Sequence, residues 1–335
     1  MSAPLERNRG QSGMTLIELM IAMVILGIVV AASFNVAYTI MNSYRGHRRA
    51  MAVERSARGA MTVLADSIRN ASPGVENAQI TDLVGCSTLK GIDVTNRSDG
   101  PDSLQIVYAS GGFITSIREA FDQSSTEMIV LDGSGLKAGD QVLITDFESR
   151  GHIMTIGDVT DNGGSYTLDL ATAPSAMCSP APAAFSYPVL STVIKAQVAE
   201  FSIDDSGDVP VLMMDRDGAG AEDPEPVAEG IEDLQIAIGV DEDGDGEVSA
   251  DAPDGVDEWY YNHEDDVAPL HAITSKPYRA LRITVVARST DETTAQPTSI
   301  RPKAEDHEGE TQPDVYRRRS LSTRVEIRNL SGSPL

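Results

Sequence analysis

A long apolar run with one acidic residue near its start constrains this chain more than any other feature. Between Met14 and Met41 the only charged side chain is Glu18, and most of the other residues are Leu, Ile, Val, Met and Ala. About 20 apolar residues of helix span the hydrocarbon core of a bilayer, so this run is long enough to cross a membrane. A carboxylate at the centre of such a span costs roughly 2.5 to 3.5 kcal/mol, and less near the interface. Glu18 therefore indicates a function and requires a partner.

The residues before the run suggest where that partner comes from. Residues 1–13 form a short polar leader with Arg7 and Arg9. If the chain is cut after Gly13, Met14 gains a free amine four residues from Glu18. The amine of a neighbouring copy would then neutralise the carboxylate inside an assembly.

This stretch, over roughly residues 8–41, resembles the type IV prepilin signal. Gly13 stands before the cut, the hydrophobic Met14 after it, and Glu18 at the fifth mature position. The resemblance implies that a prepilin peptidase cuts after Gly13 and methylates the new amine, although family members often begin with Phe where this chain has Met14. A plain signal anchor with an incidental acid is the alternative. A Sec signal peptide fits less well, because no small-residue cleavage site follows the apolar run.

The helical pattern continues past the apolar run and then stops. One set of apolar residues recurs at three- and four-residue spacing and predicts a single buried face: Val53, Ala57, Met61, Leu64 and Ile68. Pro73-Gly74 predicts the end of the helix. We expect residues 14–41 to span the membrane and residues 42–72 to continue as an amphipathic helix. The resemblance implies an α+β fold, the lollipop of type IV pilins, in which this helix packs on an antiparallel β-sheet head formed by residues 75–335.

Three arginines just beyond the apolar run conflict with the usual charge rule for membrane topology. Arg45, Arg48 and Arg49 lie on the head side, whereas basic residues usually flank the cytoplasmic end of a span. We still place the head outside, because the processing signal requires a cytoplasmic leader. Contacts with phospholipid head groups or with acidic faces of neighbouring subunits would account for these arginines, and so would a solvated helix face.

From residue 75 onward the pattern is typical of β structure. Apolar or alternating runs separated by Gly, Asp, Asn and Ser predict strands at residues 103–109, 127–131, 141–147, 152–159, 166–170, 189–203, 231–240, 278–289 and 317–330. Residues 110–188 are expected to form a small inserted β subdomain. Residues 204–230 are predicted to be an acidic, turn-rich segment and residues 290–314 a mobile loop.

Charge and cysteine content place the head in an exported compartment. The net charge of −25 excludes nucleic acid as a partner, because the phosphates would be repelled. Cys86 and Cys178 both follow the span, and an even count in an oxidising space favours a disulfide between them. It would close a loop of about 90 residues, worth on the order of 4 kcal/mol in the chain-entropy model. Two buried thiols are the alternative.

An acidic loop at residues 241–258 is the second informative motif. Three aspartates occupy alternate positions at its start: Asp241, Asp243 and Asp245. Gly246 permits a sharp turn, so the three carboxylates can converge on one cation. The order fits the first half of an EF-hand loop, D-x-D-x-D-G, in which the backbone carbonyl of Glu247 would be the next ligand and Val248 would face inward.

The second half of the loop departs from an EF-hand. Its twelfth position is Ala252 instead of Glu, so the closing carboxylate must come from elsewhere, with Asp251, Asp254 and Asp257 nearest. No Lys or Arg occurs from Asp217 to Ser275, so a Ca²⁺ ion is the simplest balance for this charge. Magnesium fits less well because it requires a stricter octahedron. A solvated acidic turn is the alternative.

The segments around this loop carry a closer resemblance. Residues 229–236, followed by Gly239-Val-Asp-Glu-Asp-Gly-Asp-Gly246, are similar to PilW-like minor pilins, in which a strand leads into an Asp-rich loop. Residues 281–288 and 316–330 look like the final strands of that family. The resemblance is strong at the two ends of the chain and weak across residues 110–225.

The resemblance implies a minor pilin at or near the tip of a type IV pilus, where it helps to start assembly. Its partners would be other minor and major pilins, the prepilin peptidase and the inner-membrane assembly platform. The chain would cross the inner membrane once with its head in the periplasm, and would later lie in the extracellular pilus.

Three other functions are compatible with parts of this pattern. A J-type pseudopilin of type II secretion has the same plan in a different machine. A calcium-dependent tip adhesin would carry its ligand face in residues 110–225. A membrane-anchored hydrolase would need clustered catalytic groups, but the five histidines are scattered and no G-x-S-x-G elbow occurs. We therefore expect no enzymatic activity.

Overall fold

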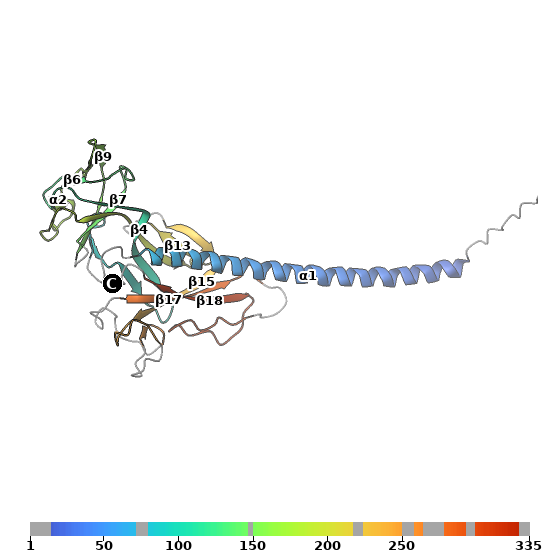
Figure 1. Ribbon diagram of the computed structural model, residues 1–335. Coiled ribbons are helices and arrows are strands. Elements are labelled where there is room, and N and C mark those ends of the chain that lie inside the picture. The colour runs from blue at the N-terminus through green and yellow to red at the C-terminus, as the bar shows by residue number, and fades with distance from the viewer. Residues whose placement is uncertain are drawn as a thin grey trace, which may run out of the picture. The chain divides into compact units, whose positions relative to one another are not determined.

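The long N-terminal helix and the β-rich head are present as expected (Figure 1). The computed structural model describes residues 15–71, 80–146, 150–216, 224–249, 258–263, 278–292 and 299–327. Contacts divide the chain into two units, Met1–Met51 and Ala52–Leu335. The fold is α+β: the helix α1 (Leu16–Arg69) begins in the first unit, and the described strands all belong to the second.

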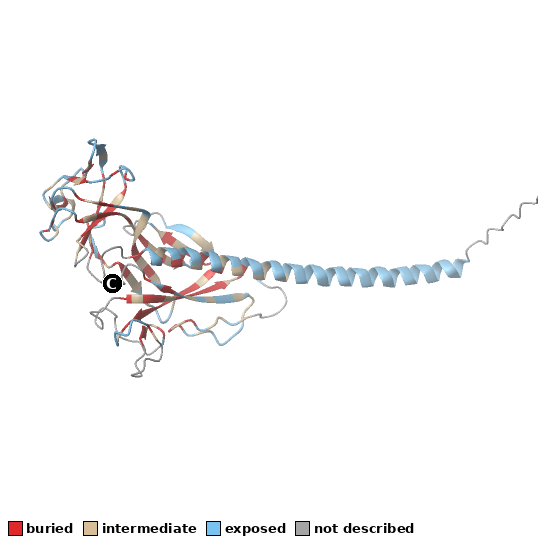
Figure 2. Ribbon diagram, viewed as in Figure 1, coloured by how far each residue is buried: buried red, intermediate tan, exposed pale blue. Residues whose placement is uncertain are grey.

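α1 is one uninterrupted helix of 54 residues that changes character along its length. Its first part is rich in Leu, Met, Ala and Ile, and none of its residues before Val53 is buried (Figure 2). From there on, one face packs into the head through Val53, Ala57, Ala60, Leu64, Ala65 and Ile68. The predicted buried face is confirmed, except that Met61 is only half-buried. The predicted stop at Pro73-Gly74 lies outside the described residues.

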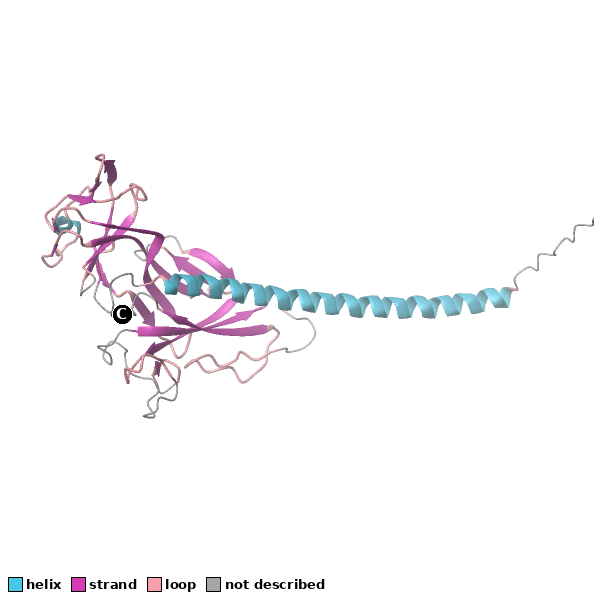
Figure 3. Ribbon diagram, viewed as in Figure 1, coloured by secondary structure: helices cyan, strands magenta, loops and turns pink. Residues whose placement is uncertain are grey.

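Most of the head is β structure (Figure 3). The largest sheet has nine strands, in the order β14-β13-β12-β7-β8-β1-β2, with β4 also paired to β12 and β3 paired to β4. Its strands are β1 (Ile80–Asp82), β2 (Ser87–Leu89), β3 (Ile92–Thr95), β4 (Ser103–Ser116), β7 (Gln141–Thr145), β8 (Gly151–Thr155), β12 (Thr192–Asp204), β13 (Val211–Asp215) and β14 (Glu225–Glu229).

A second sheet of four strands has the order β16-β15-β17-β18 and carries the sites discussed below. Its strands are β15 (Ile231–Val240), β16 (Trp259–Tyr260), β17 (Tyr278–Arg288) and β18 (Arg318–Glu326). All its pairs are antiparallel, and β17 lies between β15 and β18 over most of its length. The ends of these strands therefore bring residues near 240, 258, 279 and 326 to one edge of the sheet.

Smaller elements complete the described head. The sheet β6-β10-β9 and the pair β11-β5 consist of β6 (Glu127–Val130), β10 (Tyr166–Asp169), β9 (Asp158–Asp161), β11 (Ser186–Tyr187) and β5 (Phe121–Asp122). A single turn of helix, α2 (Pro174–Met177), precedes Cys178. These elements all fall within the stretch expected to form an inserted β subdomain.

Two main apolar clusters stabilise the head. The larger one joins the buried face of α1 to the inner faces of β12, β13, β15 and β17, with Leu64, Phe201 and Ile283 fully buried in it. The second lies within residues 83–193 and includes Phe121, Met128 and Tyr187. A separate apolar cluster is what a small subdomain needs in order to order its own strands.

The structure differs from the sequence expectations at three places. The run 152–159 is not one strand: the chain turns at Gly157, whose amide donates to the Asp169 carbonyl, so β8 and β9 join different sheets. Residues 204–230, predicted to be an acidic, turn-rich segment, contain the hairpin β13–β14. In the segment predicted to be a mobile loop, residues 299–314 are attached to the sheet, with Asp306 and His307 buried.

Candidate functional site

The start of α1 is a capping box built from Thr15 and Glu18. The Glu18 carboxylate accepts hydrogen bonds from the Thr15 amide and from the Thr15 hydroxyl, each at 2.8 Å, and the Glu18 amide donates to that hydroxyl at 3.4 Å. This is the S/T-x-x-E arrangement that satisfies free amides at a helix N-terminus. The sequence contained this signal, and the prediction of a partner for Glu18 missed it. Gly13 and Met14 lie outside the described residues.

The apolar part of α1 is long enough and apolar enough to cross a membrane. Its mean hydropathy reaches 2.6 over 18 residues, none of them buried. The most exposed of its large side chains include Leu16, Ile17, Met23, Ile28 and Phe34, with 64 to 77% of their surface accessible. An apolar surface on all sides of a helix suits contact with lipid or with other apolar helices, and its exposure to water is unfavourable.

The acidic loop begins where β15 ends, and Asp241 organises it. Asp241 is 6% exposed. Its carboxylate accepts the Gly244 amide at 2.7 Å and the Gly246 amide at 3.1 Å. Both glycines have positive φ angles, of 80° and 90°, which other residues rarely adopt. Val248 is buried, as predicted for the inward position of this loop.

A carboxylate that the sequence reading missed closes this loop. Glu258 precedes the short strand β16 and is 1% exposed. It accepts the Glu242 amide at 2.8 Å and the Ser249 amide at 2.8 Å. Ligand oxygens of Asp241, Asp243 and Glu258 lie within 4.8 Å of one another, so the three could hold one cation. The signal in the sequence that could have revealed Glu258 is its neighbour, the apolar Trp259. Trp259 pairs with Gly239 at the end of β15 and so brings Glu258 beside the loop.

Two other predicted ligands that the structure describes, Asp245 and Glu247, are not part of this carboxylate cluster. Asp245 and Glu247 are exposed, and the Asp245 carboxylate accepts the amide of Glu247 at 2.7 Å. The backbone carbonyl of Glu247 remains a predicted ligand. Asp251, Asp254 and Asp257 lie outside the described residues.

Two basic residues approach the acidic loop in the folded chain, so the expectation that no cation offsets its negative charge is wrong. Arg279, at the start of β17, places its Nη2 atom 3.6 Å from an Asp241 oxygen. Arg324 of β18 donates to the Val248 carbonyl at 2.9 Å. Strand pairing delivers both residues from distant sequence, which a local count of charges cannot register. Asp241 thus has a cation beside it in the folded chain.

Two family models match the chain, one near each end. A family model described as Type IV Pilus-assembly protein W matches residues 200–329, and a model of the prokaryotic N-terminal methylation motif matches residues 8–34. The chain is PilW-like. Among solved structures, a type IV-like pilin from Thermus thermophilus is similar, with 12% identity, coverage of 83% of this chain and 97% of that chain, and a TM-score of 0.34. A search of curated proteins found no match.

These matches divide the structure into regions. The methylation-motif match contains Gly13, Met14 and Glu18, and the PilW-like segment runs from within β12 to just past β18. It therefore contains the acidic loop and the whole four-stranded sheet. The match begins at residue 200, whereas the sequence predicted only weak resemblance to this family across residues 110–225. Residues 35–199 lie between the two matches and hold the second apolar cluster.

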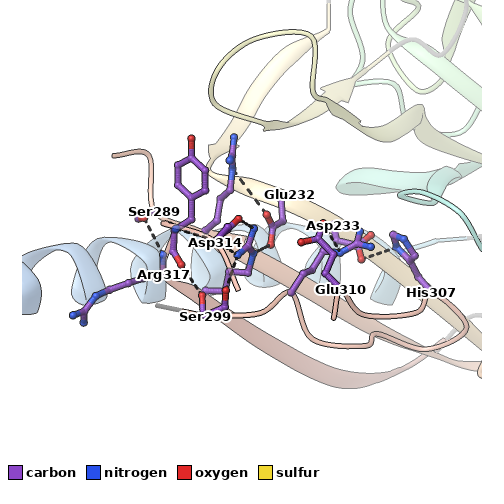
Figure 4. A network of polar contacts seen from close by, with 12 residues as sticks. Glu232, Asp233, Ser289, Ser299, His307, Glu310, Asp314 and Arg317 are labelled. Atoms are coloured by element: carbon purple, nitrogen blue, oxygen red, sulfur yellow. Dashed lines mark hydrogen bonds and ion pairs between the residues drawn. The ribbon is translucent and has the colours of Figure 1, made fainter. Parts of the chain in front are cut away.

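A polar network stabilises the PilW-like sheet on its β15 side (Figure 4). Arg318 donates two hydrogen bonds of 2.6 Å to the Asp314 carboxylate and a third to Glu232. Arg288 stacks 4.1 Å from the ring centre of Tyr316. Burial raises the pKa of Glu232, whereas hydrogen bonds from Arg318 lower the pKa of Asp314. The network fixes residues 299–316 against the sheet and has the character of a structural contact.

The same network continues inward to a buried group of polar residues. His307 Nδ1 lies 2.9 Å from Asp233, and Gln235 donates to Asp233 at 3.0 Å and to the Gly100 carbonyl at 2.8 Å. The Asp102 carboxylate accepts the amides of Arg97 and Ile236, each at 2.8 Å. Burial, with a smaller contribution from nearby carboxylates, raises the pKa of Asp102 to about 8. These contacts attach the turn before β4 to the edge of β15.

The disulfide expected from the cysteine count is formed in the structure, between residues outside the PilW-like segment. Cys86 and Cys178 have an S–S distance of 2.18 Å and a Cα–Cα distance of 5.5 Å. The bond ties the β1–β2 turn to the segment after α2. His152 lies in this region and contacts the Tyr187 hydroxyl at 2.7 Å through Nδ1. Burial lowers the pKa of His152 to about 4, which marks a neutral core residue.

Proposed function

We propose that this chain is a minor pilin of a type IV pilus that initiates assembly or lies at the pilus tip. The observation that supports it most is α1, which carries Glu18 in its first turn, has no buried residue before Val53 and overlaps the methylation-motif match. In this proposal the prepilin peptidase cuts after Gly13 and methylates the amine of Met14. The chain then resides in the inner membrane with its head in the periplasm until it enters the pilus.

Glu18 would act twice in this sequence of events. In the single chain, the capping box satisfies the carboxylate with the Thr15 hydroxyl and amide. In the assembly, the amine of a neighbouring pilin would add an ion pair in a medium of low dielectric constant, where such a pair is strong. Other minor and major pilins would be its partners, and the inner-membrane assembly platform would deliver them.

Two substitutions of Glu18 separate these roles. Glu18→Gln retains the side chain that a capping box needs, because Gln also fills that position, but it removes the charge. Glu18→Ala removes both. We expect both variants to remain in the membrane and to enter sheared filaments at least about tenfold less, a loss equivalent to about 1.4 kcal/mol. Blots of sheared filaments and of membranes measure the two quantities. Normal entry of Glu18→Gln would refute charge pairing.

A J-type pseudopilin of type II secretion has the same structural plan and is distinguished by phenotype. Deletion of this chain should abolish surface pili and leave secretion of exported enzymes unchanged. Loss of secretion with normal pili would instead support the pseudopilin. A calcium-dependent adhesin predicts normal pili that fail to attach, and would be tested with the purified chain against host and surface glycans.

We further propose that the acidic loop binds Ca²⁺ in the external medium. The support is the D-x-D-x-D-G order, the inward Val248, and the approach of Glu258 to Asp241 and Asp243. Six to eight oxygens are required, so water and the Glu247 carbonyl would complete the shell. The ion would fix the end of β15 relative to β16.

A charge-matched pair of variants tests the calcium proposal. Asp243→Ala removes a ligand, whereas Glu247→Ala removes the same charge but keeps the backbone carbonyl. At ten times the dissociation constant, calcium should stabilise the chain by about 1.4 kcal/mol, a rise of roughly 3 to 6 °C in melting temperature. We expect this rise in the wild type and in Glu247→Ala, and its loss in Asp243→Ala. Equal melting with calcium and with chelator in the wild type would contradict the site.

A further inference from the structure

A group of arginines on α1 forms an unpaired basic patch directly after the apolar run. We define the arginine collar as Arg45, Arg48 and Arg49, of which Arg45 and Arg48 are exposed and Arg49 is half-buried. At 100° per residue these positions fall within an arc of about 100° on one side of the helix. The collar is therefore one surface.

The collar has no acidic partner in the described part of the chain. No Asp or Glu occurs between Glu18 and Glu54, and Glu54 pairs with Arg58, at 2.7 Å. None of the three guanidinium groups forms an ion pair with another described residue. This is unusual in a chain with a net charge of −25. Among the described residues, the three cations therefore have no internal balance and are free to meet anionic groups of the surroundings.

The distance along the helix places the collar at a particular depth. Glu18 and Arg45 are 27 residues apart, which is roughly 40 Å of α-helix. A bilayer with its head-group regions is about 40 to 45 Å thick. When Glu18 lies at one interface, Arg45 reaches the head groups of the opposite leaflet. The exposed rings of Tyr38 and Tyr44 precede the collar, as is typical of residues at a membrane interface.

We propose that the arginine collar binds the phosphates of anionic phospholipid head groups in the leaflet on the head side. Guanidinium groups bind phosphate in a bidentate manner, which suits this ligand. The basic patch opposes the usual topology rule, and a contact with anionic head groups would compensate for it. Before assembly, the contact would fix the depth of α1 and keep Glu18 at the opposite interface. This inference rests on the membrane stage of the proposed function.

The collar is tested with the full chain in lipid, with no filament involved. The purified chain is mixed with equal amounts of phosphatidylglycerol and phosphatidylcholine, and the lipids it retains are counted by native mass spectrometry. We expect the wild type to prefer phosphatidylglycerol, with a preference that weakens as salt rises. The double variant Arg45→Gln/Arg48→Gln should lose about fivefold of this preference for each arginine removed.

Matched variants make the result specific. Arg317→Gln/Arg319→Gln removes two exposed arginines of the head and should leave the preference unchanged. Arg45→Lys/Arg48→Lys keeps the charge and should keep most of the preference. Equal retention by wild type and Arg45→Gln/Arg48→Gln would overturn the proposal.

Two further outcomes would assign the collar to another ligand. Competition by millimolar inorganic phosphate would indicate a site for free phosphate instead of a membrane contact. Unchanged lipid retention together with reduced filament entry would make the collar a contact with acidic faces of neighbouring pilins. Normal lipid selectivity with failed assembly of Glu18 variants, or the reverse, distinguishes failure of this inference from failure of the proposed function.

Discussion

The first part of α1 exposes large apolar side chains, whereas the head buries acidic ones. On α1, Leu16 and Phe34 expose 77% and 72% of their surface, whereas in the head Asp102 and Glu258 are each 1% exposed. The head surrounds its buried acids with hydrogen-bond donors. Among the described residues of the first unit, no side chain covers the apolar part of α1.

The difference shows which part of the molecule depends on its surroundings. Apolar surface on this scale must be covered by lipid or by neighbouring helices, because exposure to water is unfavourable. The head instead buries its own apolar residues in its core and gives its buried acids Asp102 and Glu258 hydrogen-bond donors from the backbone. In the proposed function, assembly therefore depends on α1.

The two regions can be measured separately in one sample. Trp259 is the only tryptophan, and it is 5% exposed in the head, so its fluorescence reports unfolding of the head. Helical circular dichroism reports α1, since the only other helix in the described residues has four residues. Each prediction below is expected to change one signal and leave the other unchanged.

Loss of the disulfide should have the largest effect, and only on the head. The bond closes 92 residues, and the chain-entropy model assigns such a loop about 4 kcal/mol. We expect Cys86→Ala/Cys178→Ala to lower the free energy of unfolding by roughly that amount in denaturant titrations followed by Trp259. Helical dichroism in detergent micelles should not change. The part of α1 from Val53 onward packs in the head, so some helix signal should be lost as the head unfolds. Loss of the whole helix signal at the same denaturant concentration would show that the two regions are not independent.

Buried acids should make the head sensitive to pH, with a smaller effect. The pKa of Asp102 is raised to about 8 by burial, so the folded chain holds a proton that the unfolded chain releases near pH 4. The stabilisation is complete below about pH 4 and is lost as pH rises through 8. We expect Asp102→Asn to reduce the loss of stability between pH 6.5 and pH 8 by about 2 kcal/mol.

The control for this pH dependence is an exposed carboxylate in the same turn. Asp99→Asn should leave the slope of stability against pH unchanged. His152 titrates on the other side of neutrality, because burial lowers its pKa to about 4, and it therefore contributes only below about pH 6.5. A slope that stays the same in Asp102→Asn would contradict the assignment of this loss to Asp102.

The sequence predicted the elements whose periodicity is long and undisturbed. α1 and β15, which runs from Ile231 to Val240 as predicted, have continuous apolar patterns. The hairpin β13–β14 was missed because Asp, Gly and Pro around it read as turns, whereas pairing of β13 with β12 supplies the ladder. Tertiary pairing of this kind has no local signal.

The candidate sites were predictable to the extent that their residues are close in sequence. Asp241 and Asp243 are two residues apart and lie together, but Glu258 and Arg279 reach the loop through pairing of β15 with β16 and β17. The attachment of residues 299–314 was likewise missed, since His307 meets Asp233 over 74 positions of sequence. Charge counts along the chain cannot anticipate either contact.

The smallest predicted effect concerns the first turn of α1. Thr15→Val keeps the shape of the side chain but removes its hydroxyl, which donates to the Glu18 carboxylate and accepts from the Glu18 amide. The substitution should therefore destabilise that end of the helix by about 1 kcal/mol. Amide hydrogen exchange of residues 16–20 in micelles should then accelerate by about fivefold, with no shift in the Trp259 unfolding midpoint. Thr39→Val is the control, because its hydroxyl bonds the Asn35 carbonyl in mid-helix. If Thr15→Val leaves exchange unchanged while Glu18→Gln still blocks filament entry, the carboxylate acts through its charge alone. If Thr15→Val also lowers filament entry, a preformed helix start is part of the assembly contact, and α1 is then not wholly dependent on its surroundings.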